Sequence, residues 1–443
     1  MKIFHEIRDP IHVFIRLSTD ERKILDSRPF QRLRNIHQLA LTYLVYPSAT
    51  HKRFEHSLGV MELASRVFDV ITTDHNIINN EIKELLPELK NKEELDYWKK
   101  VLRAASLCHD IGHLPFSHAA EKELLPDGWD HERLTVEMIK SDEMKEIWND
   151  LGLEPDDIAK LAVGQEKLPE KVNFTDWETI LSEIIVGDSF GVDRMDYLLR
   201  DAYHLGVSYG KFDHYRLIDT LRILPPAPEG SYAEERSKEP HLGVEEGGLQ
   251  SAEALLLARY FMFTQVYLHR IRRIYDIHLK DFLISWLEGG KFSINIDDLI
   301  KISDNDVLVA LQQSMLDENN ENSIFARRIV KREHFKVVYQ RNQEHLKIDR
   351  DAADLIYNAL CENFSDCNVR IDRYMQKDSN VQFPVLMNDN RLEISRRQSQ
   401  VLSKLPIAAV DYVYINRDIE KNAEKWLNKN VKDILMPTQE EDI

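Results

Sequence analysis

The stretch VLRAASLCHDIGHLPFSH, residues 101–118, joins an apolar helical run to a cluster of three histidines and an aspartate. His109 and Asp110 are adjacent, so their side chains would point about 100° apart on a regular helix. Gly112 frees the backbone at the helix end, where both side chains can turn toward one ion. The cluster therefore suggests a metal site, and the alternative is a polar helix end without any chemistry.

Two neighbouring residues do not complete a metal site, and the sequence offers two more ligands. His56 lies in the helical pattern RFEHSLGVMELASRVFDVI, and Asp193 lies in VDRMDYLLRD. With His109 and Asp110 they would supply two imidazoles and two carboxylates, which suit a catalytic divalent ion with positions open to water and substrate. We expect Mg, Mn, Fe, Co, Ni or Zn, and the ligand types do not decide among them.

Composition sets the class of protein and its environment. The 443 residues carry 76 acidic and 58 basic side chains, a net charge of −18, which disfavours nucleic acid and membrane surfaces as partners. Three cysteines make no disulfide framework, and no apolar run reaches the roughly 18–20 residues of a membrane span. We therefore expect a cytoplasmic protein that binds neither membranes nor nucleic acid.

The periodicity predicts a mainly α protein with an all-helical core and a smaller C-terminal α+β region. One helix is expected from about Leu249 to Glu288, and strand-like segments such as FKVVYQ and AAVDYVYI follow it. We place the boundary at residue 290, which gives a core of residues 1–290 and a region of residues 291–443. The sequence assigns no role to the second region, and oligomerisation and regulation are the two options. Ten of the seventeen histidines precede residue 132, so chemistry is expected in the core.

Seven segments in this order make the chain resemble a known family. They are DPIH (9–12), FQRLRNIHQL (30–39), HKRFEHSLGV (51–60), CHDIGHLPFSHAAE (108–121), DHE (130–132), VDRMDYLLRDAYHLG (192–206) and VYLH (266–269). The pattern is similar to that of the HD-domain phosphohydrolases, and most similar to their deoxynucleoside triphosphate triphosphohydrolase branch. The resemblance covers most of residues 5–280 and implies the all-helical core.

The resemblance also implies the roles of individual residues. The metal ligands would be His56, His109, Asp110 and Asp193, and the catalytic group would be His113, oriented by Glu121, with His131 as a further active-site histidine. The substrate-binding residues would be Arg53, Arg194 and Tyr197 for the phosphates, Gln38 and Asp201 for the deoxyribose, Leu39 for stacking on the sugar, and His269 for the base pocket. His118 is as well explained by a supporting or helix-capping role, and His269 by packing in the core.

An activating nucleotide is a further implication. Asp26, Gln31 and Arg34 match an allosteric guanine-nucleotide site that lies between subunits in some relatives, so its retention would imply a homo-oligomer, a dimer or a tetramer. Arg8 stands where those relatives have asparagine, and Leu114 stands where glycine is usual after the catalytic histidine.

The implied activity is metal-dependent hydrolysis of a dNTP, with water attacking the α-phosphorus to release a deoxynucleoside and tripolyphosphate. Two alternatives remain at the level of sequence. One is another HD-type nucleotidase or phosphodiesterase acting on a nucleotide or a signalling nucleotide, and the other is a regulatory protein that binds nucleotides without hydrolysing them.

Overall fold

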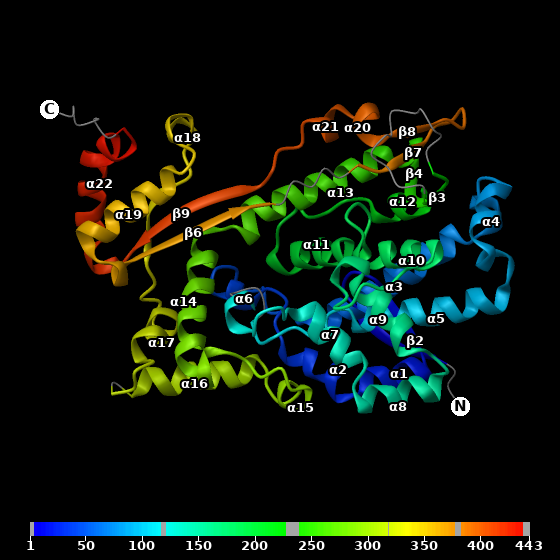
Figure 1. The fold of residues 1–443 in the computed structure, drawn as a ribbon, viewed down its shortest axis with the longest axis horizontal. Coiled ribbons are helices and arrows are strands. Elements are labelled where there is room, and N and C mark those ends of the chain that lie inside the picture. Colours follow the sequence, from blue (N-terminus) through cyan, green and yellow to red (C-terminus); the bar gives the residue numbers. More distant parts are fainter. Residues whose placement is uncertain (1–3, 117–120, 227–238, 318, 377–381, 437–443) are drawn as a thin grey trace. The chain divides into compact units, whose positions relative to one another are not determined.

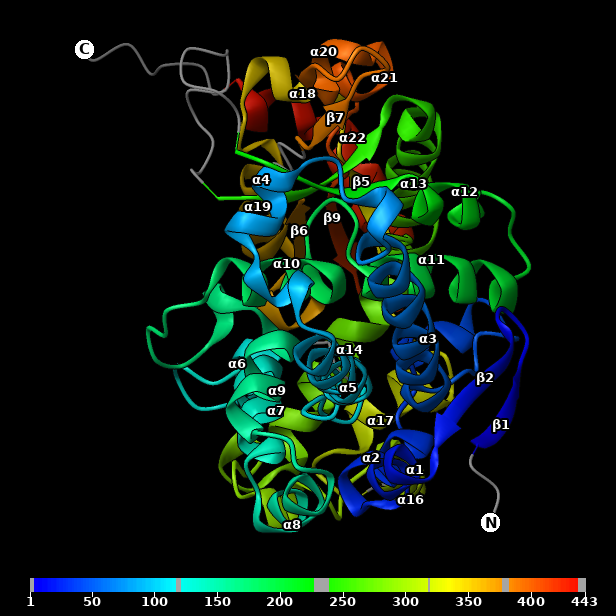
Figure 2. The same cartoon turned by 90° about the vertical axis from the view of Figure 1, so that its right-hand side faces the viewer.

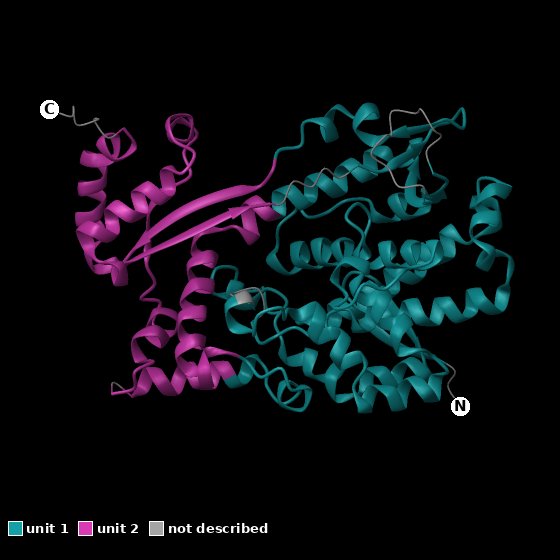
Figure 3. Ribbon diagram, viewed as in Figure 1, with its two compact units in different colours: residues 1–262, 292–306, 379–406 teal, residues 263–291, 307–378, 407–443 magenta. Residues whose placement is uncertain are grey.

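The chain divides into two compact units whose segments alternate along the sequence (Figure 3). Unit 1 comprises residues 1–262, 292–306 and 379–406, and unit 2 comprises residues 263–291, 307–378 and 407–443. The computed structural model describes residues 4–116, 121–226, 239–317, 319–376 and 382–436. The division at residue 290 was drawn on sequence character, and it stays a proposal.

Helix α3 (Arg53–Ile71) forms the centre of unit 1, because most of its circumference is buried. It packs against α5 (Lys92–Cys108), α10 (Asp176–Val186) and α11 (Val192–Leu205), as Figures 1 and 2 show. Helix α9 (Pro155–Val163) in turn contacts α5 and α10. The expected metal ligands all belong to α3, α11 or the end of α5, so this bundle positions the site.

Further helices and short sheets surround this bundle. The other helices of unit 1 are α1 (Thr19–Asp26), α2 (Arg28–Arg32), α4 (Asn80–Leu85), α6 (Glu121–Leu124), α7 (His131–Ile139), α8 (Asp142–Leu151), α12 (His214–Asp219), α13 (Leu249–Met262), α15 (Ile296–Leu299), α20 (Ser395–Gln398) and α21 (Gln400–Ser403). Its strands are β1 (Phe4–Asp9), β2 (Val13–Ser18), β3 (Leu221–Leu224), β4 (His241–Glu245), β7 (Pro384–Leu386) and β8 (Leu392–Ile394).

The N-terminal segment is an antiparallel hairpin of β1 and β2. Ser18 then caps α1, and its side chain and that of Glu21 form the reciprocal hydrogen bonds of a capping box. The turn of the hairpin contains Asp9, whose carboxylate accepts hydrogen bonds from the backbone N–H groups of Ile11 and His12. These bonds fix the direction in which His12 enters the core.

Unit 2 is built on a three-stranded antiparallel sheet in the order β5-β9-β6. Along the central strand, Val413 and Ile415 face a core formed with α19 and α22, whereas Tyr412 and Tyr414 pack with Ile274 of α14. This alternation follows from the period of two in a strand. The elements of unit 2 are α14 (Arg270–Trp286), α16 (Asp304–Leu316, from residue 307 onward), α17 (Ser323–Val330), β5 (Lys336–Gln340), α18 (Gln343–Ile348), α19 (Ala352–Phe364), β6 (Val369–Met375), β9 (Ala409–Ile415) and α22 (Glu420–Leu435).

The predicted mainly α fold with a smaller α+β part is confirmed. The prediction of one continuous helix over residues 249–288 is wrong. The helix expected from about Leu249 to Glu288 is divided into α13, a π-helical turn over residues 263–267, and α14. His269 ends the interruption, and its Nδ1 accepts a hydrogen bond from the backbone N–H of Ile271, as a helix cap does. Among the described residues, none of the helices combines the length and the apolar character of a transmembrane span.

Substitution of Gly59 by Ala is expected to destabilise the protein, because the side chains of Asp196 and Arg200 from α11 occupy the space that a Cβ would need. A Cβ at this position would lie 1.9 Å from Asp196 Oδ1 and 2.5 Å from Arg200 Nη2, and both of those side chains are buried. Overpacking of this kind costs about 1–3 kcal/mol in the free energy of unfolding, to be measured by urea denaturation. Glu62→Gln on the same helix is the control, and equal stabilities of the two variants would contradict this account.

Candidate metal centre

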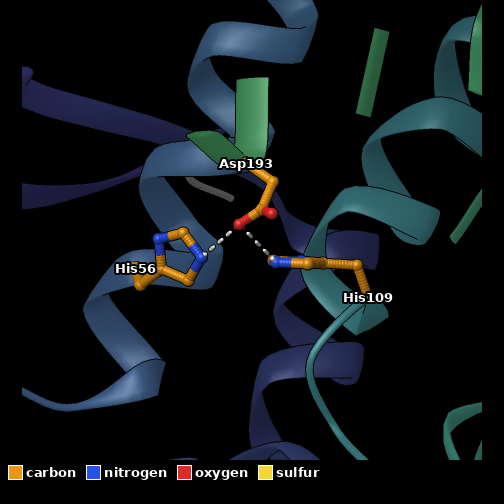
Figure 4. Close-up of side chains that lie close together, drawn as sticks. All are labelled: His56, His109 and Asp193. Atoms are coloured by element: carbon orange, nitrogen blue, oxygen red, sulfur yellow. Dashed lines mark hydrogen bonds and ion pairs between the residues drawn. The ribbon is translucent and has the colours of Figure 1, made fainter. Parts of the chain in front are cut away.

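Three side chains from three helices converge on one point in unit 1 (Figure 4). His56 comes from the first turns of α3, His109 from the residue that ends α5, and Asp193 from the first turn of α11. The Nε2 atoms of His56 and His109 lie 3.0 Å and 3.6 Å from Asp193 Oδ1. One potential ligand atom of each residue lies within 4.8 Å of the others, which is the spacing that one ion requires.

The hydrogen bonds of both histidines leave Nε2 directed into the site. His56 Nδ1 lies 2.8 Å from Asp196 Oδ2, and His109 Nδ1 lies 2.8 Å from the Ser106 carbonyl oxygen. A carboxylate or carbonyl acceptor on Nδ1 is the usual way to orient a metal-binding imidazole. His109 Nε2 is buried and has no hydrogen-bond partner among the described residues, although burial of such an atom is costly. These residues therefore fit a divalent ion.

Asp110, the fourth expected ligand, lies at the edge of this group and is paired with an arginine. Its Oδ2 accepts a hydrogen bond from Arg53 Nη1 at 2.5 Å, and its Oδ1 lies 3.4 Å from His109 Nε2. The structure thus brings the four expected ligands together, with Asp110 also 3.8 Å from His56 Nε2. Arg53, expected to contact phosphate, adjoins them.

A buried network that the sequence analysis did not assign supports His56. Asp196 accepts hydrogen bonds from Arg200 and lies 2.7 Å from His12 Nε2, while its other oxygen contacts His56. Arg200 also donates to Asp9 at 2.8 Å. The three-residue step from Asp193 to Asp196 on α11 was the available signal, since such residues lie on one face of a helix.

Charge in the metal-free site is balanced by protonated imidazole. Burial would lower the pKa of His56, but the hydrogen bonds that its imidazole donates to Asp193 and Asp196 outweigh it and raise this pKa to about 10. Burial would also lower the pKa of His109, but the negative charges of Asp110 and Asp193 outweigh it and raise this pKa. Burial would raise the pKa of Asp193, yet His109 and His56 hold it well below its usual range. A dication could replace these protons, because it supplies the same positive charge.

The expected catalytic histidine lies beside the metal group. His113 Nε2 is 3.1 Å from Asp110 Oδ1, and its ring stacks on that of His131 with centroids 4.0 Å apart. Glu121 accepts a hydrogen bond from the backbone N–H of His131 and lies 2.9 Å from its Nδ1. The structure thus places Glu121 beside His131. That Glu121 orients His113 stays a prediction. His118 lies outside the described residues.

The residues expected to bind deoxyribose are connected through His51. The His51 carbonyl accepts a hydrogen bond from Gln38 N at 3.0 Å, and His51 Nε2 lies 2.7 Å from Asp201 Oδ1. Gln38 Oε1 is buried and has no hydrogen-bond partner among the described residues. Leu39 follows and is 7% exposed. Polar groups of both acceptor and donor type therefore gather at this point, as recognition of a sugar hydroxyl requires.

The other expected phosphate contacts lie on α11. Arg194 donates to the Gly187 carbonyl and to Asp188 Oδ1, both at 2.7 Å, so its guanidinium points toward the loop before α11. Burial would lower the pKa of Arg194, but the electrostatic interactions with Tyr197 and Asp188 outweigh it and raise this pKa. The guanidinium is therefore a fixed positive charge. Tyr197 is half-buried on the same helix, one turn after Asp193.

The remaining predicted residues lie apart from the metal group or in unit 2. Gln31 Oε1 accepts a hydrogen bond from Arg34 Nε at 2.9 Å, so these two expected allosteric residues are neighbours. The third, Asp26, is exposed and pairs with Arg22 at 3.2 Å. His269 belongs to unit 2, and its contact with the base of a substrate stays a prediction.

A second group of possible ligands lies near the first. Glu121, His131 and Glu132 have potential ligand atoms within 4.8 Å of one another, but Lys167 Nζ already lies 2.6 Å from Glu132 Oε1. A lysine ammonium at this distance competes with a cation for the carboxylate. The group of His56, His109 and Asp193 is therefore the stronger metal centre.

Comparisons with known proteins agree with this geometry. A family model described as HD domain matches residues 53–170, and one described as HD associated region matches residues 212–439. A solved structure of a hypothetical protein from Aquifex aeolicus has a TM-score of 0.75 and 33% identity, and the match covers 96% of this chain and 100% of that one.

Two relatives extend the comparison by sequence. An uncharacterized protein of Methanocaldococcus jannaschii is 34% identical over 322 residues, 71% of this chain and 58% of that protein. Deoxynucleoside triphosphate triphosphohydrolase SAMHD1 of Mus musculus is 32% identical over 353 residues, 71% of this chain and 50% of that protein. The match therefore spans about half the length of the mouse relative.

Removal of one ligand is expected to abolish metal retention. Wild-type protein loaded with Mn²⁺ and dialysed should keep about one equivalent per chain, and Asp193→Ala should keep almost none. Asp196→Asn should weaken affinity about 10–100-fold, because it leaves the ligands in place but disturbs the hydrogen bond that orients His56. Metal content measured by mass spectrometry tests this, with the exposed Asp156→Asn as control. Retention by Asp193→Ala equal to that of the control would contradict the site.

Metal-free protein is expected to lose stability as the pH rises above neutrality. The folded-state pKa of His56 is raised to about 10 from its ordinary 6.5, so its protonation stabilises the fold fully below pH 6.5 and less and less up to about pH 10. Urea denaturation of chelator-treated protein between about pH 7 and 9.5 measures this loss, which His56→Gln should reduce. A level stability of the metal-free wild type over that range would refute it.

Proposed function

This chain belongs to the family of HD-domain phosphohydrolases with an HD associated region, and we propose that it hydrolyses deoxynucleoside triphosphates to deoxynucleosides and tripolyphosphate. Water attacks the α-phosphorus, the bond from phosphorus to the nucleoside 5′ oxygen breaks, and a proton passes to that oxygen. The name of the SAMHD1 relatives supports this substrate class.

One observation carries the proposal. His109 Nε2 is buried without a hydrogen-bond partner among the described residues, and it faces the Asp110 and Asp193 carboxylates across from His56. Such an atom is costly unless a ligand completes it. When bound there, a divalent ion would polarise the phosphoryl group and lower the pKa of water from 15.7 toward about 7. His56, His109, Asp110 and Asp193 would hold it.

Arginines supply the local positive charge that a triphosphate needs. The protein as a whole carries a net charge of −18, so a substrate with about four negative charges must be attracted by local groups. Arg53 is 98% buried beside Asp110, and Arg194 lies one residue after Asp193. Guanidinium groups bind phosphate oxygens through two parallel hydrogen bonds, and we assign both arginines to this task.

His113 is the group that we assign to proton transfer. Burial and the positive charges of Arg53 and His131 lower the pKa of His113 well below its ordinary range, so the imidazole is neutral at pH 7 before substrate binds. The negative charge of a bound triphosphate favours the protonated form. His113 would then donate its proton to the departing 5′ oxygen, while His131 stacks on its ring.

The deoxyribose is assigned to the cluster around His51. The buried Gln38 Oε1 and the Asp201 carboxylate are the polar groups that this cluster offers to a sugar hydroxyl, and Leu39 offers an apolar face. A site that hydrogen-bonds one hydroxyl discriminates strongly against analogues that leave its polar groups unpaired. We further propose a cytoplasmic homo-oligomer and an activating nucleotide at Asp26, Gln31 and Arg34.

Incubation with each dNTP, singly and mixed, is expected to yield deoxynucleoside and tripolyphosphate in the presence of Mg²⁺, Mn²⁺ or Co²⁺. Asp110→Ala should lower kcat about 10³-fold or more, because it removes a ligand and the partner of Arg53. Products separated by ion-exchange chromatography identify the bond that is cleaved. Asp156→Asn serves as the matched control, because Asp156 is exposed and forms an ion pair with Lys140.

The products also separate the alternatives. Free phosphate or a nucleoside monophosphate would replace this proposal by another HD-type nucleotidase or phosphodiesterase. Binding of dNTPs without any product, under every metal tested, would indicate a regulatory nucleotide-binding protein. Activity that arises only in dNTP mixtures would support the allosteric nucleotide.

A further inference from the structure

Asp304 is the first residue of α16 and belongs to unit 1. It is buried and contacts two segments near the candidate site. Its Oδ1 accepts a hydrogen bond from the backbone N–H of Phe116 at 2.8 Å. Its Oδ2 accepts from the backbone N–H of His37 at 2.7 Å and lies 2.6 Å from His37 Nδ1. One carboxylate thus holds the loop that follows His113 and the segment that contains Gln38.

From this geometry we infer that Asp304 is a positioning residue for the reaction and for the choice of sugar. It fixes the loop of His113 relative to the segment of Gln38 and Leu39, and so sets the distance between proton transfer and deoxyribose recognition. The inference rests on the proposed function for the role of those residues. It concerns a residue some 190 positions after the HD pair in the chain.

Two backbone conformations show that these segments need such support. Phe116 has φ of 50° and Ala40 has φ of 45°, which is the left-handed region that residues with a side chain seldom adopt. Strained backbone of this kind persists only where surrounding contacts determine it, and it is concentrated at functional sites. Asp304 provides that contact at Phe116 directly, and it holds His37 three residues before Ala40.

A second buried side chain strengthens the same connection. Arg32 Nη1 donates to the carbonyl oxygen of His113, and its Nε donates to the carbonyl oxygen of Ile302, both at 2.8 Å. Arg32 and Asp304 attract each other, although burial lowers the pKa of Arg32 to about 10. The segment of residues 302–304 is therefore connected to both ends of the loop from His113 to Phe116, to Phe116 directly and to His113 through Arg32.

The ring of His37 completes the arrangement. It stacks between Tyr43 and Phe116, with centroids 5.3 Å and 5.8 Å away, and its Nε2 lies 2.7 Å from Lys52 Nζ. An ammonium donates to Nε2, so Nδ1 carries the proton that Asp304 accepts. Lys52 and Arg32 thus offset the charge of Asp304, and Lys52 directly precedes Arg53 in the chain. Asp304, His37 and Lys52 are not among the proposed metal ligands.

Asp304→Asn tests the inference, because it keeps the shape and loses one acceptor. An asparagine amide would place N–H groups against a backbone N–H, either at Phe116 or at His37. We expect kcat for dNTPs to fall about 10–100-fold and the ratio of kcat/KM for dNTP over rNTP to fall about 10-fold, with metal content unchanged. Asp306→Asn is the matched control, since Asp306 is exposed on the same helix and its carboxylate accepts hydrogen bonds from the backbone N–H and the hydroxyl of Ser303.

Amide hydrogen exchange keeps the inference testable without catalysis. In folded Asp304→Asn, the peptides that contain His37 and Phe116 should exchange about 10-fold faster than in Asp306→Asn, because bonds to a charged acceptor are lost. His37→Phe keeps the stacked ring and the backbone bond. It should lower the preference for dNTP over rNTP while exchange at Phe116 stays at the wild-type rate.

The outcomes separate this inference from the proposed function. If wild-type protein hydrolyses dNTPs and Asp304→Asn matches Asp306→Asn in kcat, sugar preference and exchange, the inference is overturned. If wild-type protein hydrolyses no dNTP, the proposed function fails, and the exchange comparison alone decides whether Asp304 fixes the two segments.

Discussion

The carboxylate of Asp196 is the buried contact on which the candidate site depends. It orients the imidazole of His56, accepts hydrogen bonds from Arg200 and contacts His12 from the N-terminal hairpin. Only a glycine at position 59 leaves room for this carboxylate between α3 and α11. The packing of α3 against α11, the position of the hairpin and the direction of His56 Nε2 therefore all depend on the same carboxylate.

Electrostatic balance links this packing to chemistry. Burial of a charge is costly unless it is paired, and here Arg200 pairs with Asp9 and Asp196, whereas Arg53 pairs with Asp110. Among the described residues, Asp193 forms its ion pairs with the imidazoles of His56 and His109 and not with an arginine. Protons on those imidazoles supply the compensating positive charge in the metal-free protein, and a bound dication would supply it instead. Metal binding would then be coupled to proton release.

The sequence predicted the residues with chemistry better than the residues that orient them. The spaced histidines and aspartates indicated the side chains that the structure brings together as a candidate metal centre, since each falls in a recognisable helical pattern. Asp196 and Asp304 were missed because their roles depend on partners about 140 and 190–270 positions away in the chain. No local pattern distinguishes such a carboxylate from an ordinary residue on a helix.

The fold shows the same limit. The mainly α class and the strands of unit 2 followed from periodicity, but the helix expected over residues 249–288 is interrupted at 263–269. Aromatic residues continue through that stretch, so its helical pattern is unbroken and the π-helical turn leaves no sequence signal. The alternation of the two units along the chain was likewise invisible, because it depends on which segments return to which core.

Anomalous diffraction from crystals grown with Mn²⁺ would test the central claim most directly. The account predicts a single strong peak per chain, about 2.0–2.6 Å from Nε2 of His56, Nε2 of His109 and a carboxylate oxygen of Asp193. A peak at Glu121, His131 and Glu132, or the absence of any peak between the three helices, would contradict it.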